Sequence, residues 1–245
     1  MARHAKHPSA TAPPNYCTPR PISARLTAYF RKIPHVWPIL WFSIYIAFLI
    51  LDIFLPTSFF LITALKYLGI FLCFVYAWRR FPQDHLLTLA LAFTLLADTV
   101  FVVNNTSIIG IFVFCIAQFF HFARLRRTST AALLVYFVIV LAVFFFGVTQ
   151  KITPIFIIAA IYAGTLGLNL LSSAGWYLRE RSVAAFCALI GFILFALCDC
   201  CVATSYFATT AVFPAYLYDY ANFFAWAFYL PSQIFISNSS KTMIQ

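Results

Sequence analysis

The stretch Phe93–Phe101 reads FTLLADTVF, and it places one carboxylate, Asp98, inside an otherwise oily run. The run continues on both sides as Leu86–Val103, a length typical of a helix that crosses a bilayer, which needs roughly 17–25 residues. A second run, Val183–Phe207, repeats the arrangement around Asp199 in FALCDCCVA. Because a charged group inside such a run is costly, both acids are candidates for function.

The composition of the whole chain indicates an integral membrane protein. Of its 245 residues, 64% are hydrophobic and only 9% are charged, whereas soluble domains carry about 25% charged residues. Too few charges remain to cover a water-facing surface. We therefore expect an all-α polytopic membrane protein, since the chain also lacks the alternation typical of a membrane β-barrel.

Eight apolar runs predict eight transmembrane helices. They are Trp37–Phe54, Phe59–Trp78, Leu86–Val103, Ile108–Ala123, Ala131–Val148, Pro154–Leu171, Val183–Phe207 and Tyr216–Ser237. Residues 1–34 are basic and rich in Pro, Ser, Thr and Ala, so we expect a disordered cytoplasmic tail whose end forms a short helix on the membrane surface. The membrane domain then covers residues 35–240.

The basic residues predict the orientation of these helices. The formal net charge is +10, and in a chain this apolar the excess orients helices rather than binding nucleic acid. With the N-terminus in the cytoplasm, all but two of the 16 Lys and Arg residues fall in cytoplasmic segments or the tail, the exceptions being Lys66 and Lys151. Both termini are therefore predicted to be cytoplasmic, in a cell membrane or an endomembrane.

The seven cysteines predict neither a disulfide framework nor a metal site. They lack zinc-type spacing, and most lie in apolar runs, where reduced thiols act as small hydrophobic side chains. Cys198, Cys200 and Cys201 surround Asp199, but no histidine is near them in the sequence. We expect no metal and no cofactor, because the chain also has no glycine-rich phosphate loop.

A weak internal repeat accompanies the two carboxylates. LAFTLLAD ends at Asp98 and FILFALCD ends at Asp199. Both runs are expected to cross the membrane from inside to outside, which is consistent with a parallel duplication of four helices. Chance similarity between apolar helices explains the match equally well.

Three ionisable residues fall at similar depths in the outer half of the expected bilayer. At about 1.5 Å per residue, Lys66, Asp98 and Asp199 are close enough in depth to share one pocket as its catalytic groups. A structural ion pair of Lys66 with one acid is the alternative, but it leaves the other acid unexplained. Amide side chains in neighbouring segments are expected to line the pocket and bind substrate: Asn105, Asn169 and Gln233.

Other ionisable residues lie nearer the membrane surfaces. His121 is near the inner end of its run, where it either faces lipid headgroups or helps to bind substrate in the pocket. Asp52 and Asp219 lie near the outer ends of theirs, and we expect both at the membrane–water interface.

The order of these motifs resembles the YhhN-like lysoplasmalogenase family. The similar stretches are LALAFTLLADTVFVV, FVFCIAQFFHFARL, GFILFALCDCCVA and YLPSQIFIS, within about residues 37–240. The resemblance implies eight membrane helices, with a Lys in the second, acids in the third and seventh, and a His in the fourth. Lys66, Asp98, Asp199 and His121 occupy those places.

The chain also departs from the family pattern close to these residues. Ala97 stands before the first acid in place of Gly, and Tyr67 follows the lysine in place of Pro. Cys198 precedes the second acid, and Arg124 stands where a Tyr is common after the histidine.

The resemblance implies hydrolysis of the vinyl ether bond of a lysoplasmalogen, a single-chain ether phospholipid, to a fatty aldehyde and a glycerophospho-base. This chemistry needs one carboxylic acid that protonates carbon and one carboxylate that stabilises the resulting cation, as in the paired acids of glycosidases. Asp98 and Asp199 would divide these roles, and Lys66 would set which of them stays ionised. The partners implied are the lysophospholipid substrate and the bilayer.

Two other functions fit the same residues. Intramembrane acids and a lysine in a repeated bundle also suit a proton-coupled or small-solute transporter, although the chain has few glycines and no matched pair of broken helices. A non-catalytic membrane protein that keeps the fold is the third interpretation.

Overall fold

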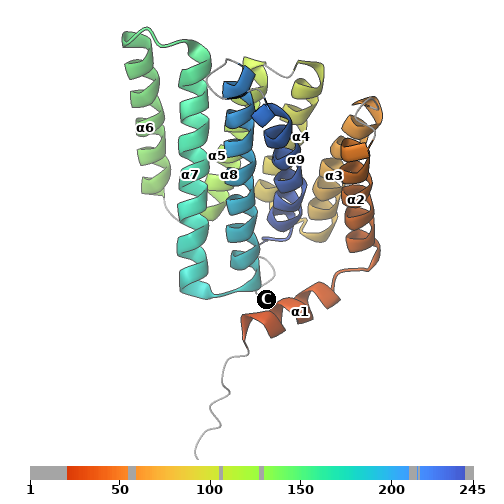
Figure 1. Ribbon diagram of the computed structural model, residues 1–245. Coiled ribbons are helices and arrows are strands. Elements are labelled where there is room, and N and C mark those ends of the chain that lie inside the picture. Colours follow the sequence, from red (N-terminus) through yellow and green to blue (C-terminus); the bar gives the residue numbers. More distant parts are fainter. Residues whose placement is uncertain are drawn as a thin grey trace, which may run out of the picture.

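The computed structural model describes residues 21–54, 59–104, 107–126, 130–209, 214 and 216–240. Within these ranges all regular structure is helical, and Figure 1 shows long helices packed side by side with a short helix across one end. The helices are α1 (Ile22–Arg31), α2 (Val36–Phe54), α3 (Phe59–Arg80), α4 (His85–Val103), α5 (Ile108–Leu125), α6 (Thr130–Thr149), α7 (Pro154–Glu180), α8 (Val183–Thr209) and α9 (Tyr216–Ser237). The predicted all-α fold class is confirmed.

Seven of the described helices, α2 to α8, are long and apolar enough to cross a membrane. Their outward faces carry large apolar side chains, of which Phe137, Phe145 and Phe146 on α6 are 49%, 62% and 62% exposed. Water would not tolerate so large a continuous apolar surface, whereas lipid tails cover it. The chain is therefore a multi-pass membrane protein, as predicted.

Each apolar run predicted from the sequence falls on one long helix, in order from α2 to α9. The largest difference concerns α7, which continues to Glu180 rather than ending near Leu171. The added turns carry Ser172, Ser173 and Trp176, which are all buried. Tertiary packing therefore extends this helix beyond the stretch that hydropathy alone marks.

The helix α9 lies in the bundle between α8 on one side and α2 and α3 on the other (Figure 1). It approaches α8 closely at Gly191, where an added Cβ would lie 2.6 Å from the Ile236 side chain and 3.0 Å from the Ile236 backbone nitrogen. Small residues allow such close helix contacts in membranes, where packing replaces the hydrophobic effect between helices. The helix α6 packs on α7 at the opposite edge of the bundle.

A proline lies inside α9, and a tyrosine of α2 compensates for it. Pro231 has no N–H, so it cannot donate to the carbonyl of Ala227 four residues earlier. The hydroxyl of Tyr45 donates to that carbonyl oxygen at 3.0 Å. The hydrogen bond joins α2 to α9 and satisfies a backbone group that lipid would leave unpaired.

The basic end of the bundle is the end crossed by α1, with the connections after α3, α5 and α7 (Figure 1). The segment after α9 returns there, and Asn238 accepts hydrogen bonds at its Oδ1 from Tyr29 of α1 at 3.0 Å and from Tyr76 of α3 at 2.8 Å. Burial raises the pKa of the Tyr29 phenol, so it remains a neutral donor. The end of the predicted tail thus forms a helix, as expected, while residues 1–20 lie outside the described residues.

Candidate functional site

Asp98 lies on α4 and is held by one tyrosine of α9. Its side chain is buried, with 8% of the residue exposed. The Tyr229 hydroxyl is 2.9 Å from Oδ1 and 2.8 Å from Oδ2, so a single phenol donates to both oxygens of the carboxyl group. Among the described residues, no Lys or Arg forms an ion pair with Asp98.

Asp199 lies on α8 in a matching arrangement. The hydroxyl of Tyr162, on α7, donates to Asp199 Oδ2 at 2.7 Å. Asp199 is half-buried. No cation within the described ranges pairs with this carboxyl group either.

The two carboxyl groups belong to one region of the bundle. Cys198 is within electrostatic range of both Asp98 and Asp199. The ring of Phe195 lies 5.6 Å from that of Tyr229, and Phe114 continues the aromatic contacts to the ring of Tyr162 at 5.9 Å. We use the name carboxyl pair for the two acids together with their donors, which are Tyr229 for Asp98 and Tyr162 for Asp199. Each acid has a neutral phenol as its donor.

Lys66 does not pair with either of these acids, contrary to the expected arrangement. Its Nζ lies 3.2 Å from Asp52 Oδ1, in an ion pair that is largely buried. Asp52 lies near the end of α2, and the long side chain of Lys66 reaches toward that end from within α3. The pair therefore joins α2 to α3 near the end of α2, which gives Asp52 a partner that its position in the sequence did not reveal.

Lys66 is linked to the partner of Asp98 through one aromatic ring. Its Nζ lies 4.7 Å from the ring centroid of Trp226, and that ring is 5.5 Å from the ring of Tyr229. A cation over an indole face is attracted to it. Lys66 thus supports the aromatic wall behind Tyr229 rather than neutralising Asp98.

Three of the residues predicted to bind substrate lie nearer the basic end. His121, Asn169 and Gln233 are all fully buried. His121 lies seven residues after Phe114 on α5, and Asn169 lies seven residues after Tyr162 on α7. At about 1.5 Å per residue, both are about 10 Å nearer the basic end than the carboxyl pair. Asn105, the fourth, lies outside the described residues.

These three side chains and Gln118 are all buried at this end of the bundle, and we call the four residues the polar layer. Asn169 Nδ2 donates to the Gln118 backbone oxygen at 2.9 Å and to its Oε1 at 2.8 Å. Several polar atoms of the layer have no hydrogen-bond partner within the described part of the chain: both ring nitrogens of His121, Gln118 Nε2, Asn169 Oδ1 and Gln233 Oε1. The expected single pocket is therefore resolved into two levels, the carboxyl pair and this layer.

Comparison with models of known protein families identifies the family of this chain. The model of the YhhN family matches residues 61–240, which is more than half of the chain. The chain belongs to the YhhN family. The match includes α4 to α9, all four residues of the carboxyl pair and the polar layer, while Asp52 precedes it. Searches of curated proteins and of solved structures found no match.

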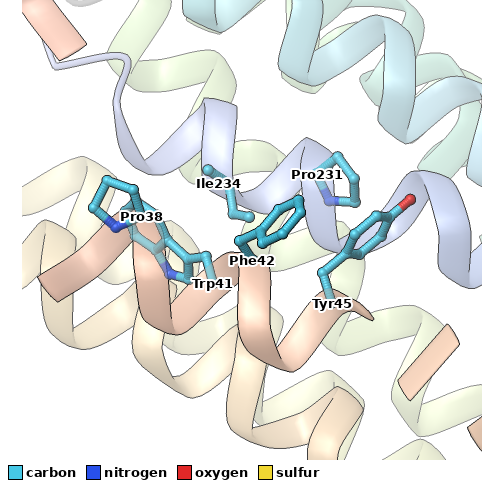
Figure 2. Close-up of a pocket in the computed structure, with 6 residues that line it drawn as sticks. All are labelled: Pro38, Trp41, Phe42, Tyr45, Pro231 and Ile234. Atoms are coloured by element: carbon cyan, nitrogen blue, oxygen red, sulfur yellow. The ribbon is translucent and has the colours of Figure 1, made fainter. Parts of the chain in front are cut away.

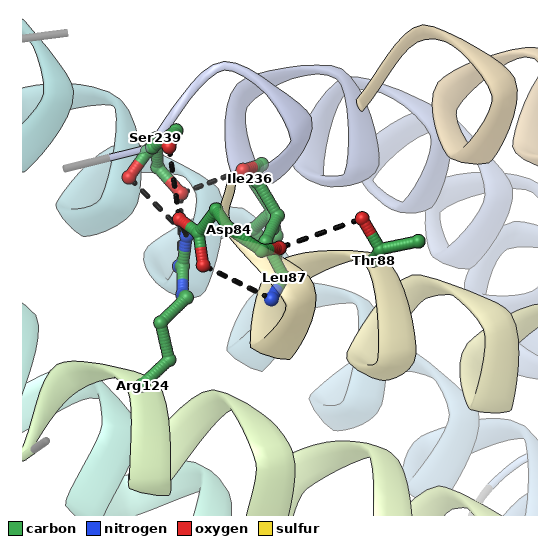
Figure 3. Close-up of polar contacts among 7 residues, drawn as sticks. Asp84, Leu87, Thr88, Arg124, Ile236 and Ser239 are labelled. Carbon is green, nitrogen blue, oxygen red and sulfur yellow. Dashed lines mark hydrogen bonds and ion pairs between the residues drawn. The ribbon is translucent and has the colours of Figure 1, made fainter. Parts of the chain in front are cut away.

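The YhhN match also extends to a network at the basic end that sequence reasoning missed (Figure 3). Arg124 of α5 is 2% exposed; its guanidinium donates to Ser239 at the backbone oxygen, at 3.2 Å, and at Oγ, at 2.9 Å. Asp84 caps the N-terminus of α4, where it accepts from the Leu87 N–H at 3.3 Å, and it lies 3.8 Å from the guanidinium. Ser240 donates to Asp84 Oδ2 at 2.9 Å. We call these residues the basic-end network.

Two tyrosines of the carboxyl pair were also missed in this YhhN-family chain. Tyr162 and Tyr229 lie inside apolar runs, at the depth of Asp199 and Asp98. A phenol at that depth needs a hydrogen-bond partner, since lipid offers none. This need was the available signal: a mid-span tyrosine predicts a polar group on a neighbouring helix.

Proposed function

We propose that this protein hydrolyses the vinyl ether bond of lysoplasmalogens, using Asp98 and Asp199 as its acid and its carboxylate. The observation that carries the proposal is the carboxyl pair itself: two acids in one region of a membrane bundle, each held by a phenol and neither neutralised by a described cation. Membership of the YhhN family supports it.

The reaction requires one proton donor and one anion. A protonated carboxyl group donates its proton to the vinyl carbon farther from the ether oxygen, and the electron pair of the ether oxygen forms an oxocarbenium ion. The second carboxylate stabilises that cation and takes a proton from water as the water adds. The hemiacetal then collapses to a fatty aldehyde as its hydroxyl proton passes to the leaving oxygen of the glycerophospho-base. The proton that the second carboxylate took from water returns to the first, so one water is consumed overall.

The environment of each acid suits this division of work. A carboxylate that faces Lys or Arg is held as an anion, whereas a carboxyl group beside a neutral phenol can gain and lose a proton. The half-buried position of Asp199 offers access to an amphiphile that diffuses within the bilayer. The resident bilayer then delivers the substrate.

The finer topology belongs to the same proposal. We infer that α9, with 22 residues, is the eighth transmembrane helix and that both termini are cytoplasmic. The return of Asn238 to α1 at the basic end supports an even number of crossings. A parallel 4+4 repeat would then relate α4, with Asp98, to α8, with Asp199.

The test is aldehyde release by the purified full chain from lysoplasmalogen in detergent. Asp98→Asn and Asp199→Asn are expected to lower the rate by roughly 10²–10⁴-fold, the range for loss of a general acid or base. Asp219→Asn, which changes an exposed acid at the start of α9, is the matched control and should retain the rate. Wild-type rates of aldehyde release in both Asp98→Asn and Asp199→Asn would refute the mechanism.

A transporter remains the second candidate because of the buried polar layer. Its unpartnered polar atoms on α5, α7 and α9 continue from the carboxyl pair toward the basic end. Such a line of groups suits proton or solute passage. Substrate-dependent proton flux in sealed vesicles, with no aldehyde produced in detergent, would favour this candidate.

A further inference from the structure

Two shallow cavities, both open to the surroundings, lie along one face of α2 and the residues just before it. The first, of about 170 Å³, is lined by Pro34, Trp37, Tyr76, Arg79 and Arg80 at the basic end. The second, of about 190 Å³, is lined by Pro38, Trp41, Phe42, Tyr45, Pro231 and Ile234 between α2 and α9 (Figure 2). Neither cavity includes a residue of the carboxyl pair or the polar layer.

The spacing of the lining residues places the two cavities next to each other along α2. Positions 34, 37, 38, 41, 42 and 45 recur at intervals of three and four, which is the spacing of one helix face. Trp37 of the first cavity and Trp41 of the second are in contact, with ring centroids 6.0 Å apart. A ligand therefore meets a charged opening and then an apolar groove that runs along the bundle.

The opening is strongly positive. Arg79 and Arg80 end α3 and are both exposed. Within the described ranges no carboxylate pairs with either of them. Tyr76 lines the same cavity with its ring, because its hydroxyl donates a hydrogen bond to Asn238 instead of facing the opening.

The groove is apolar and faces the space that lipid fills. Phe42 is 68% exposed along it, while Trp41 and Tyr45 form its wall, with the Tyr45 hydroxyl already bound to the Ala227 carbonyl. Its lining thus presents carbon surface to a ligand. Basic pockets between membrane helices bind anionic lipid headgroups, and arginine suits phosphate because its guanidinium donates in pairs.

The geometry points to a binding site for one anionic phospholipid of the bilayer, with its headgroup phosphate on Arg79 and Arg80 and one acyl chain along Trp41, Phe42 and Tyr45. The site is separate from the carboxyl pair and does not depend on the proposed reaction. An occupant there joins α2 to α3 and α9, so we expect it to stabilise the bundle.

The test is lipid retention by the delipidated full chain, measured by native mass spectrometry in detergent with phosphatidylglycerol and phosphatidylcholine supplied together. The wild type should retain phosphatidylglycerol preferentially, and the double variant Arg79→Gln, Arg80→Gln should lose this preference by roughly tenfold or more. The double variant Arg179→Gln, Arg181→Gln removes two exposed arginines from the same end and should keep it.

A second pair of variants tests the groove. Phe42→Ala should weaken retention, whereas Phe146→Ala, on α6 at the opposite edge of the bundle and 62% exposed, should not. Equal retention of the two lipids by the wild type, or equal losses in both double arginine variants, would overturn the proposal. So would displacement by inorganic phosphate with no effect of Phe42→Ala, because that result describes a small-anion site. If the double variant does not fold, the single changes Arg79→Gln and Arg80→Gln are measured in its place.

Discussion

Asp84 at the basic end and Asp98 within the bundle are both buried, at 6% and 8% exposure, yet they have different partners. Asp84 has a buried arginine, a backbone N–H and a serine hydroxyl. Asp98 has one phenol, which donates to both of its oxygens. Asp199 resembles Asp98, with a single phenol from Tyr162.

The different partners of these acids indicate a structural role for Asp84 and a chemical role for Asp98 and Asp199. The ion pair and the hydrogen bonds of Asp84 join the start of α4 to α5 and to the segment after α9. A carboxyl group with only a neutral donor is free to exchange its proton, which acid catalysis requires. Damage to the basic-end network should therefore lower stability, and damage to the carboxyl pair should lower turnover.

The largest effect on stability is expected for Arg124→Gln. Removal of one partner of a buried ion pair costs about 3–5 kcal/mol, because the remaining Asp84 charge stays buried. The melting temperature in detergent should fall by roughly 10 °C. Arg179→Gln, at an exposed site, is the control. An unchanged melting temperature in Arg124→Gln would contradict the structural role of the network.

A smaller effect, on rate rather than stability, is expected for Tyr229→Phe and Tyr162→Phe. Each removes the phenol that orients one carboxyl group, and hydrogen bonds to charged groups contribute about 1.5–3 kcal/mol. Aldehyde release should fall roughly 10- to 100-fold. Tyr136→Phe, which removes a buried phenol bonded to Thr165 at 3.2 Å, should leave the rate unchanged. Wild-type rates in both site variants would show that the phenols do not serve the acids.

Both regions should respond together to Gly191→Ala. The added methyl group meets Ile236 of α9, which lies between Tyr229 and Ser239 in the sequence, and overpacking costs about 1–3 kcal/mol. We expect lower thermal stability and a lower rate of aldehyde release. Gly167→Ala is the matched control, because an added Cβ there meets no atom within 4 Å. If Gly191→Ala and Gly167→Ala behave alike, α8 and α9 are not tightly joined at this point.

The smallest effect is expected for Tyr45→Phe. It leaves the Ala227 carbonyl without the donor that replaces the missing N–H of Pro231, which should cost about 1 kcal/mol of stability while the rate is retained. A double-mutant cycle with Pro231→Ala sharpens the test, since alanine restores the backbone N–H. The cost of Tyr45→Phe should then diminish. A cost that is the same in both backgrounds would rule out this compensation.

The sequence by itself determined that lipid surrounds this protein, where its long helices lie along the chain, and how deep in the membrane its unusual polar residues are. The reason is that lipid requires long apolar helices with internally satisfied backbones, and these leave a direct mark on composition and run length. It also marked Asp98 and Asp199, because an acid is conspicuous in such a run.

Only the tertiary structure decided which polar groups meet. Lys66 pairs with Asp52 rather than with Asp98, and Arg124, which the sequence counted among the cytoplasmic charges, is buried against Ser239. Depth along a helix can be read from residue number, but the direction in which a side chain points depends on the rotation of each helix against its neighbours. In this bundle packing sets that rotation, through contacts such as Gly191 against Ile236 that link residues far apart in the chain.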